Sequence, residues 1–122
     1  MPGLAEGELS FEFSPGWEIS KLDEWSFYRN QFQNVCNGTK AVDILAIEPG
    51  LDCVWCIEVK DYRRHRRRKT VSVAEETACK VRDSLALLAA ANANANDAGE
   101  KAMARHALSA RQMRSCFTSS SR

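Results

Sequence analysis

The stretch AVDILAIEPGLDCVWCIEVKDYRRHRRRK, residues 41–69, decides the fold, because it holds two apolar runs separated by a turn. Residues 41–47 and 53–60 are short and rich in aliphatic side chains, and residues 49–52 between them contain Pro and Gly, which together predict an antiparallel strand pair. Apolar residues occupy both faces of the first strand, so we expect helices to cover the sheet on both sides. The stretch therefore predicts an α/β fold.

Three charged residues interrupt these apolar runs. If Glu48 and Cys53 close the hairpin, Asp43 stands directly opposite Glu58, and Lys60 shares the face of Glu58 because the two are two residues apart. Opposed side chains have Cβ atoms ~5 Å apart, where two carboxylates repel unless a proton or a cation lies between them. A hard divalent ion, Mg²⁺ or Mn²⁺, would remove the repulsion. The alternative is an ordinary ion pair with Lys60 at an exposed strand end.

A run of positive charge follows the second strand. Six of the 17 basic residues lie between positions 63 and 69, and the other 11 are outnumbered by 16 acids. Such a local concentration suits the grip of a polyanionic backbone, and the alternative is a solvated loop. We call this segment the basic strip, and its predicted nucleic-acid contacts are Arg63, Arg64, Arg66, Arg67, Arg68 and Lys69.

Helical spacing precedes the strand pair. Trp25, Tyr28, Phe32 and Val35 recur every three or four residues, which predicts a helix of about three turns. Asp23 stands where an N-cap is expected.

A long amphipathic helix is predicted after the basic strip, with Ser72 and Glu75 in capping-box spacing. Its expected buried stripe is Val71, Ala74, Ala78, Val81, Leu85 and Leu88. The opposite side of this helix is interpreted as a solvated surface, with the alternative that a residue near the start of the helix overlooks the predicted metal site. That side carries Glu75, Glu76, Lys80 and Asp83. A second helix is predicted over about residues 100–113.

The two ends of the chain carry weaker signals. Residues 11–13 and 17–19 alternate in the manner of a short hairpin. The polar residues 114–122 are expected to form a frayed tail, with at most a short final strand. The length predicts a single domain over residues 1–122, with its core at about residues 11–113.

The composition, 44% hydrophobic and 27% charged, is typical of a soluble protein. No apolar run approaches the ~20 residues of a membrane helix and no signal peptide precedes the domain, so we expect a cytoplasmic protein without a membrane partner. The five cysteines are odd in number, which favours reduced thiols. Cys53 and Cys56 are three apart on a strand and point to opposite faces, which disfavours the alternative of a zinc or redox protein.

The two acids and the lysine together resemble a known motif. Asp43, fourteen further residues, and then Glu58-Val59-Lys60, set in AVDILAI and CVWCIEVK, resemble the PD-(D/E)xK phosphodiesterase superfamily, although Val42 stands at the position of the motif's proline. The resemblance covers residue 23 to about residue 90. It implies a restriction-endonuclease-like core, in which helices flank a central mixed sheet of about four strands. The weak final strand implies that this core is truncated at its C-terminus.

The same resemblance implies a function. It implies a nuclease that hydrolyses nucleic-acid phosphodiester bonds, of DNA rather than RNA, with Asp43, Glu58 and Lys60 as catalytic residues. Mg²⁺ or Mn²⁺ would be held by the two acids and the backbone carbonyl of Val59, with Glu24 as a further candidate ligand. The alternative is an inactive nucleic-acid-binding or scaffold module of the same fold. Nucleic acid is the implied partner, and two copies could pair as a homodimer.

Overall fold

The computed structural model describes residues 3–6, 9–35, 38–61 and 72–120. The strands are β1 (Gly3–Glu6), β2 (Leu9–Glu12), β3 (Glu18–Ser20), β4 (Ile44–Ile47), β5 (Cys53–Asp61) and β6 (Gln112–Ser120). The helices are α1 (Gln33–Val35), α2 (Val73–Asn94) and α3 (Ala98–Ser109). Shorter helical turns are the 3-10 turns η1 (Leu22–Glu24) and η3 (Pro49–Leu51) and the π-helical turn η2 (Tyr28–Phe32).

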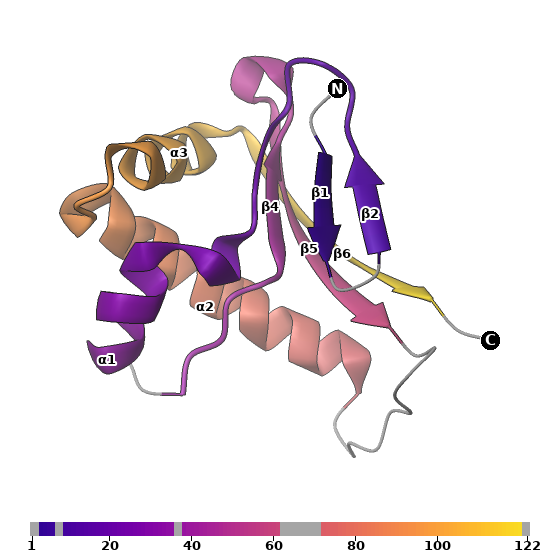
Figure 1. The fold of residues 1–122 in the computed structure, drawn as a ribbon, viewed down its shortest axis with the longest axis horizontal. Coiled ribbons are helices and arrows are strands. Elements are labelled where there is room, and N and C mark those ends of the chain that lie inside the picture. The colour runs from indigo at the N-terminus through magenta and orange to yellow at the C-terminus, as the bar shows by residue number, and fades with distance from the viewer. Residues whose placement is uncertain (1–2, 7–8, 36–37, 62–71, 121–122) are drawn as a thin grey trace.

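Four strands form the central sheet, in the order β3-β4-β5-β6 (Figure 1). β4 is antiparallel to β3 and to β5, whereas β6 runs parallel to β5. The prediction of an α/β fold with a mixed sheet of about four strands is therefore confirmed.

The register of the central hairpin is also the one that the sequence predicted. Ile44 pairs with Ile57 and Ile47 pairs with Val54, and the N–H of Glu48 donates to the carbonyl of Cys53 at 2.9 Å. The residues between them form the turn η3. Because both faces of β4 are apolar, the apolar pattern alone does not select this register, and the turn at residues 49–52 sets it.

The C-terminal residues differ from the prediction. Residues 114–122 were expected to be a frayed tail, but β6 reaches Ser120 and pairs with nine residues of β5. The core therefore extends beyond residue 113. The strand could not be recognised from this polar sequence. Its pairing with β5 uses backbone hydrogen bonds, which do not require an alternating apolar pattern.

The N-terminal hairpin also differs from the prediction. β1 pairs with β2 in a separate two-stranded sheet, and β3 joins the central sheet beside β4. The predicted pairing of residues 11–13 with residues 17–19 is therefore wrong. Period-two alternation identified strand β3 but not its partner, which lies far along the chain.

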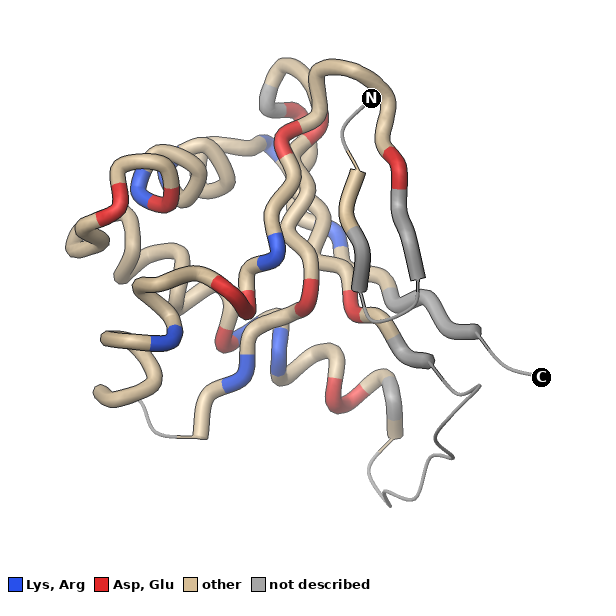
Figure 2. Tube along the Cα trace, in the orientation of Figure 1, with Lys and Arg blue, Asp and Glu red and all other residues tan. Residues whose placement is uncertain are grey.

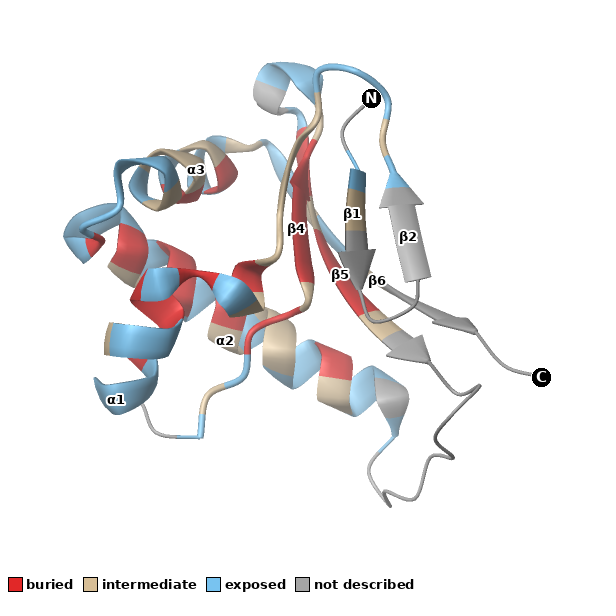
Figure 3. Cartoon of the chain, viewed as in Figure 1, coloured by how far each residue is buried: buried red, intermediate tan, exposed pale blue. Residues whose placement is uncertain are grey.

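Different layers cover the two faces of the central sheet (Figures 1 and 3). On one face Leu45, Val54 and Cys56 pack in a core that includes buried residues of α2 and α3. On the other face Ile44 and Ile57 form a second core, which a second layer of partly buried apolar residues covers. The second layer includes Leu4 of β1, Phe13, Trp17 and Ile19. The expectation of helices on both faces is thus wrong for this side.

The helical region before β4 is divided into short pieces. Trp25, Tyr28 and Phe32 are buried as predicted, but Val35 is 83% exposed. Asp23 lies inside η1 and is not the N-cap of the region.

The start of this region is held by a residue from another helix. The backbone N–H groups of Ser26 and Phe27 donate to the carboxylate of Glu100, at 2.8 and 3.0 Å. Glu100 lies in α3, so the cap is 73 residues away from Phe27 in sequence. A carboxylate at this position satisfies N–H groups that have no partner within the helix.

Helix α2 begins as predicted but presents a different face to the sheet. The Ser72 hydroxyl accepts a hydrogen bond from the N–H of Glu75 at 3.1 Å, which confirms the predicted N-cap. The predicted stripe members Leu88 and Val81 pack in the core, but Ala74, Ala78 and Leu85 are exposed. The buried residues of the helix are Thr77, Ser84, Leu87, Leu88 and Ala91. Among the described helices none is both long and apolar enough to cross a membrane.

Candidate functional site

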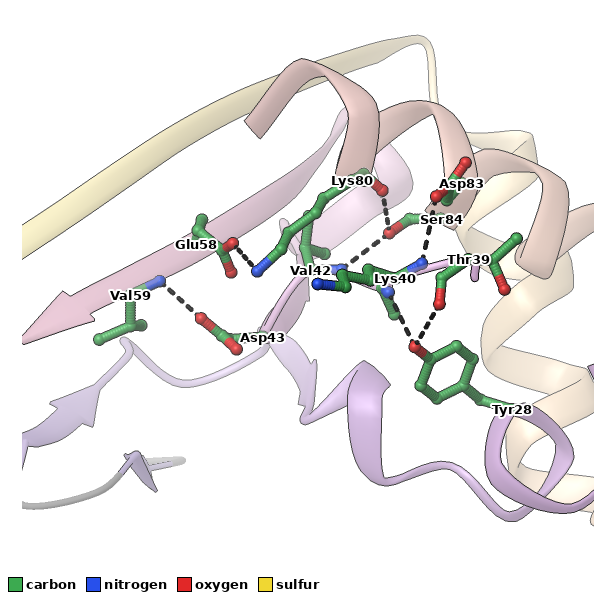
Figure 4. Close-up of polar contacts among 11 residues, drawn as sticks. Tyr28, Thr39, Lys40, Val42, Asp43, Glu58, Val59, Lys80, Asp83 and Ser84 are labelled. Atoms are coloured by element: carbon green, nitrogen blue, oxygen red, sulfur yellow. Dashed lines mark hydrogen bonds and ion pairs between the residues drawn. The ribbon is translucent and has the colours of Figure 1, made fainter. Parts of the chain in front are cut away.

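The predicted meeting of the two acids takes place. Asp43 immediately precedes β4, and continuing the observed register by one residue sets it opposite Glu58. Its Oδ2 accepts a hydrogen bond from the N–H of Val59 at 2.7 Å (Figure 4). Asp43 is half-buried, and Glu58 is completely buried on the sheet face that α2 covers. The main-chain contact fixes the Asp43 carboxylate next to that of Glu58.

A cation from a third element completes this group. Lys80 projects from α2 and its Nζ forms an ion pair with Oε2 of Glu58 (Figure 4). The Lys80 side chain is 21% exposed, so the pair lies mostly out of water. We call Asp43, Glu58 and Lys80 the charged cluster. Figure 2 shows that acidic and basic residues meet where β4, β5 and α2 approach one another.

The charged cluster contains a carboxylic acid, Glu58, whose pKa is unusually high. Burial raises the pKa of Glu58 from its ordinary 4.5 to about 7, and the hydrogen bond and negative charge of Asp43 act in the same direction. Lys80 opposes this rise. Burial lowers the pKa of Lys80, but its hydrogen bond with Glu58 and the nearby negative charges outweigh that effect, so this pKa is raised. Lys80 thus stays positively charged, whereas Glu58 is ionised, and its contact with Lys80 a full ion pair, only above about pH 7.

Side chains from two helices anchor the backbone that leads to Asp43. The Tyr28 hydroxyl donates to the Thr39 carbonyl at 3.1 Å and accepts from the N–H of Ala41 at 3.2 Å. The Ser84 hydroxyl accepts from the N–H of Val42 at 2.9 Å and donates to the carbonyl of Lys80 at 2.7 Å.

Asp83 adds a further anchor from the same helix. Its Oδ2 accepts from the N–H of Lys40 at 3.1 Å, and its Oδ1 lies 3.3 Å from Nε of Arg82. Four hydrogen bonds therefore tie the backbone of the segment before β4 to η2 and α2, and they are made by the side chains of Tyr28, Asp83 and Ser84 (Figure 4). This network holds Asp43 in register before the strand begins.

A surface pocket opens beside the charged cluster. It has a volume of about 340 Å³ and lies between the first half of α2 and the segment before β4. Lys80 is one of its lining residues, whereas Glu58 is not. Its charged lining residues are Lys40, Glu75, Glu76, Lys80, Arg82 and Asp83. The lining thus carries both signs of charge.

Several predicted site residues lie outside this arrangement. Lys60 belongs to β5 by its backbone, but its side chain is outside the described part of the structure. The whole basic strip, Arg63, Arg64, Arg66, Arg67, Arg68 and Lys69, also falls outside the described residues. Glu24 is exposed and pairs with Lys21 at 2.9 Å, and that contact lowers the pKa of Glu24. The catalytic and nucleic-acid-binding roles predicted for these residues stay predictions.

The cysteines follow the prediction of separate faces. Cys56 belongs to the core under the helices, and burial raises its pKa to about 12. Burial also raises the pKa of Cys53. Both are free thiols, and the described residues contain no group of three or more Cys, His, Asp or Glu placed to hold a metal ion.

The residue that the sequence analysis missed is Lys80. It was assigned to the solvated side of α2 because its neighbours Glu75, Glu76 and Asp83 are also charged. In the structure it lies near the buried face, three residues after Thr77 and four before Ser84. The signal that would have identified Lys80 is its helical spacing from Thr77 and Ser84, which sets the three polar residues on one side of α2.

The predicted Mg²⁺ site can be tested against the contacts of the charged cluster. Mg²⁺ requires a near-octahedral set of oxygen ligands and retains several waters. Here Oδ2 of Asp43 accepts from the N–H of Val59, Oε2 of Glu58 pairs with Lys80, and Glu58 is sealed from solvent. This arrangement does not fit a divalent ion while Lys80 keeps its place. The predicted metal ligands, Asp43, Glu58, the Val59 carbonyl and Glu24, stay a prediction.

Comparison with known proteins gives a different relative from the one expected. No protein-family model matches the chain. No solved structure matches it either. A curated protein from Neisseria meningitidis serogroup A / serotype 4A (strain DSM 15465 / Z2491) aligns with 93% of the chain at 30% identity over 145 positions. The chain resembles part of a cysteine–tRNA ligase. It spans about one fifth of that protein, since the alignment covers 20% of the ligase.

This similarity overturns the nuclease interpretation. The relative is by name a ligase for cysteine and tRNA, and not a phosphodiesterase. The assignment to the PD-(D/E)xK superfamily is therefore wrong, together with the predicted hydrolysis of DNA or RNA and the alternative of an inactive module of that fold. The physical reason is that acids opposed across a hairpin require only some cation, and Lys80 supplies one.

Proposed function

We propose that this chain is an RNA-binding segment related to part of a cysteine–tRNA ligase, and that tRNA is its partner. The observation that carries the proposal is the similarity to that ligase over 93% of the chain. Because the chain spans a fifth of the ligase, the proposal concerns binding and assigns no aminoacylation to it.

The charge distribution supports a polyanionic partner. Six basic residues of the strip connect the end of β5 to the start of α2 in sequence. Lys40 and Arg82 are exposed beside the first half of α2 and line its pocket. Lysine and arginine side chains bind phosphates of any sequence and release counterions, so their contribution to affinity falls as salt rises.

The proposal is tested by the binding of the purified chain to a cysteine-accepting tRNA. Fluorescence anisotropy with labelled tRNA, a second tRNA and a DNA duplex of similar charge is measured between 50 and 200 mM salt. We expect the tRNAs to bind more tightly than the DNA duplex. Neutralising all six strip residues should reduce the slope of log K against log salt by roughly 4 to 5, because each lost phosphate contact removes about 0.7 to 0.9.

A matched pair of variants controls for net charge. Arg67→Gln with Arg68→Gln removes two charges from the strip, whereas Lys101→Gln with Arg105→Gln removes two exposed charges from α3. Helix α3 packs beside η3 at the start of β5, whereas the strip follows β5 in sequence (Figure 1). Only the first pair should reduce the salt slope. Equal effects of both pairs, or DNA binding as tight as tRNA binding, would contradict the proposal.

A further inference from the structure

We infer that the Lys80 ammonium, which contacts Glu58 beside Asp43, takes the role that a divalent cation would otherwise have at this pair of acids, so that the protein carries its own counterion there. The inference is independent of tRNA binding. It concerns whether a pair of carboxylates on neighbouring strands still binds a metal ion when a lysine from a helix contacts one of them.

The first support is the origin of the three residues. Asp43 precedes β4, Glu58 lies within β5, and Lys80 comes from α2. Sheet register brings the two acids together, and the packing of α2 brings the lysine to them. Three elements therefore converge on one point, as Figure 4 shows.

The second support is the use of the carboxylate oxygens. Oδ2 of Asp43 accepts a main-chain hydrogen bond from Val59, and Oε2 of Glu58 contacts Nζ of Lys80. A divalent ion bridging the two acids would lie beside the Lys80 ammonium, and the two cations would repel each other. Lys80 and such an ion would thus compete for the Glu58 carboxylate.

The third support is the anchoring of Lys80 itself. The Ser84 hydroxyl donates to the carbonyl of Lys80 and accepts from the N–H of Val42, which couples the turn of α2 that bears the lysine to the segment that bears Asp43. Both Ser84 and Glu58 are completely buried. The backbone of α2 at Lys80 is therefore tied to the segment that bears Asp43, and the completely buried Glu58 carboxylate meets the ammonium from the sheet.

Mn²⁺ binding measured on the whole chain tests the inference. Mn²⁺ is followed by electron paramagnetic resonance, in which the free ion gives the signal that binding removes. We expect no saturable binding to the wild-type chain that depends on Asp43, as judged against Asp43→Asn. Lys80→Met removes the charge but keeps a long side chain, and should bind one Mn²⁺ at least about tenfold more tightly, because the competing cation is gone.

Two further variants keep the test decisive. Lys80→Arg retains the charge and should bind Mn²⁺ no better than the wild type. Adding Asp43→Asn to Lys80→Met should abolish the new site. Wild-type binding of one Mn²⁺ that Asp43→Asn removes would overturn the inference, and this measurement holds even if Lys80→Met does not fold. A folded Lys80→Met chain without gained Mn²⁺ affinity would overturn it as well.

Discussion

The two halves of helix α2 face the same sheet with different chemistry. The first half buries Thr77 and Ser84 and places Lys80 on Glu58, whereas the second half buries Leu87, Leu88 and Ala91 in the apolar core. Both halves belong to one continuous helix, and both contact the sheet. The difference shows that the burial of a helix face follows what lies opposite it, and that polar residues are buried where they meet the charged end of β4 and β5.

The two halves should respond differently to substitution. Side chains of the second half contribute by removing apolar surface from water and by filling space. Polar side chains of the first half stabilise the fold only when they form hydrogen bonds or ion pairs, because a buried polar group without such a partner destabilises it.

The apolar half should give the largest loss on truncation. Leu88→Ala removes a completely buried side chain and leaves a cavity, so we expect the free energy of unfolding to fall by about 3 kcal/mol. Urea denaturation followed by circular dichroism measures the loss. Leu85→Ala is the matched control, since Leu85 is 41% exposed and should lose less than about 1 kcal/mol. Equal losses would contradict the assigned helix face.

The polar half should make stability depend on pH. Native Glu58 holds its proton up to about pH 7, whereas the unfolded chain releases it near the ordinary value of 4.5. The native state therefore binds more protons in this window, and stability must fall as pH rises through it, by roughly 2 to 3 kcal/mol between pH 5 and 8. Urea denaturation at a series of pH values measures the change.

Glu58→Gln is the control for this pH dependence. The variant cannot titrate at position 58, so its stability should vary less than that of the wild type between pH 5 and 8. A wild-type protein that gains stability over this range would show that Glu58 is ionised in the native state throughout it.

A smaller effect is expected from the anchor between α2 and the segment before β4. Ser84→Ala removes the acceptor for the N–H of Val42 and leaves that buried group without its partner, which should cost about 1 to 2 kcal/mol. Hydrogen exchange at the Val42 amide should accelerate more than exchange at Ile57 in the middle of β5. Ser109→Ala is the control, since that exposed hydroxyl donates only within α3.

The sequence was sufficient for the central hairpin and for the meeting of Asp43 and Glu58. Its two apolar runs predict the strand pair, and the assumption that Glu48 and Cys53 close the hairpin gave the observed register, which sets the acids opposite each other. Local pattern therefore predicted the part of the site that local pairing creates.

The remaining part of the site depends on contacts between distant residues. Lys80 was assigned to solvent because the buried stripe of α2 was sought among apolar residues alone. Glu100 caps a helical turn more than 70 residues earlier in the chain, and β6 is a strand through its pairing with β5. The cap by Glu100 and the pairing of β6 have no periodic signal in sequence, because tertiary packing fixes them, and the signal of Lys80 lies only in its helical spacing from Thr77 and Ser84.

The functional prediction failed for a related reason. Opposed acids followed by a lysine describe a charge arrangement, and such an arrangement does not by itself specify a reaction. The similarity to part of a cysteine–tRNA ligase came from the whole chain and not from this triplet.

A double-mutant cycle between Glu58 and Lys80 tests most directly whether the lysine is the counterion of the acid pair. The free energies of unfolding of Glu58→Gln, Lys80→Met and the double variant are compared with that of the wild type at pH 8. We predict a coupling of at least about 2 kcal/mol, since either single change leaves the other group without its partner, and the double change leaves neither. Losses that add to within about 0.5 kcal/mol would show that Lys80 does not neutralise the acids.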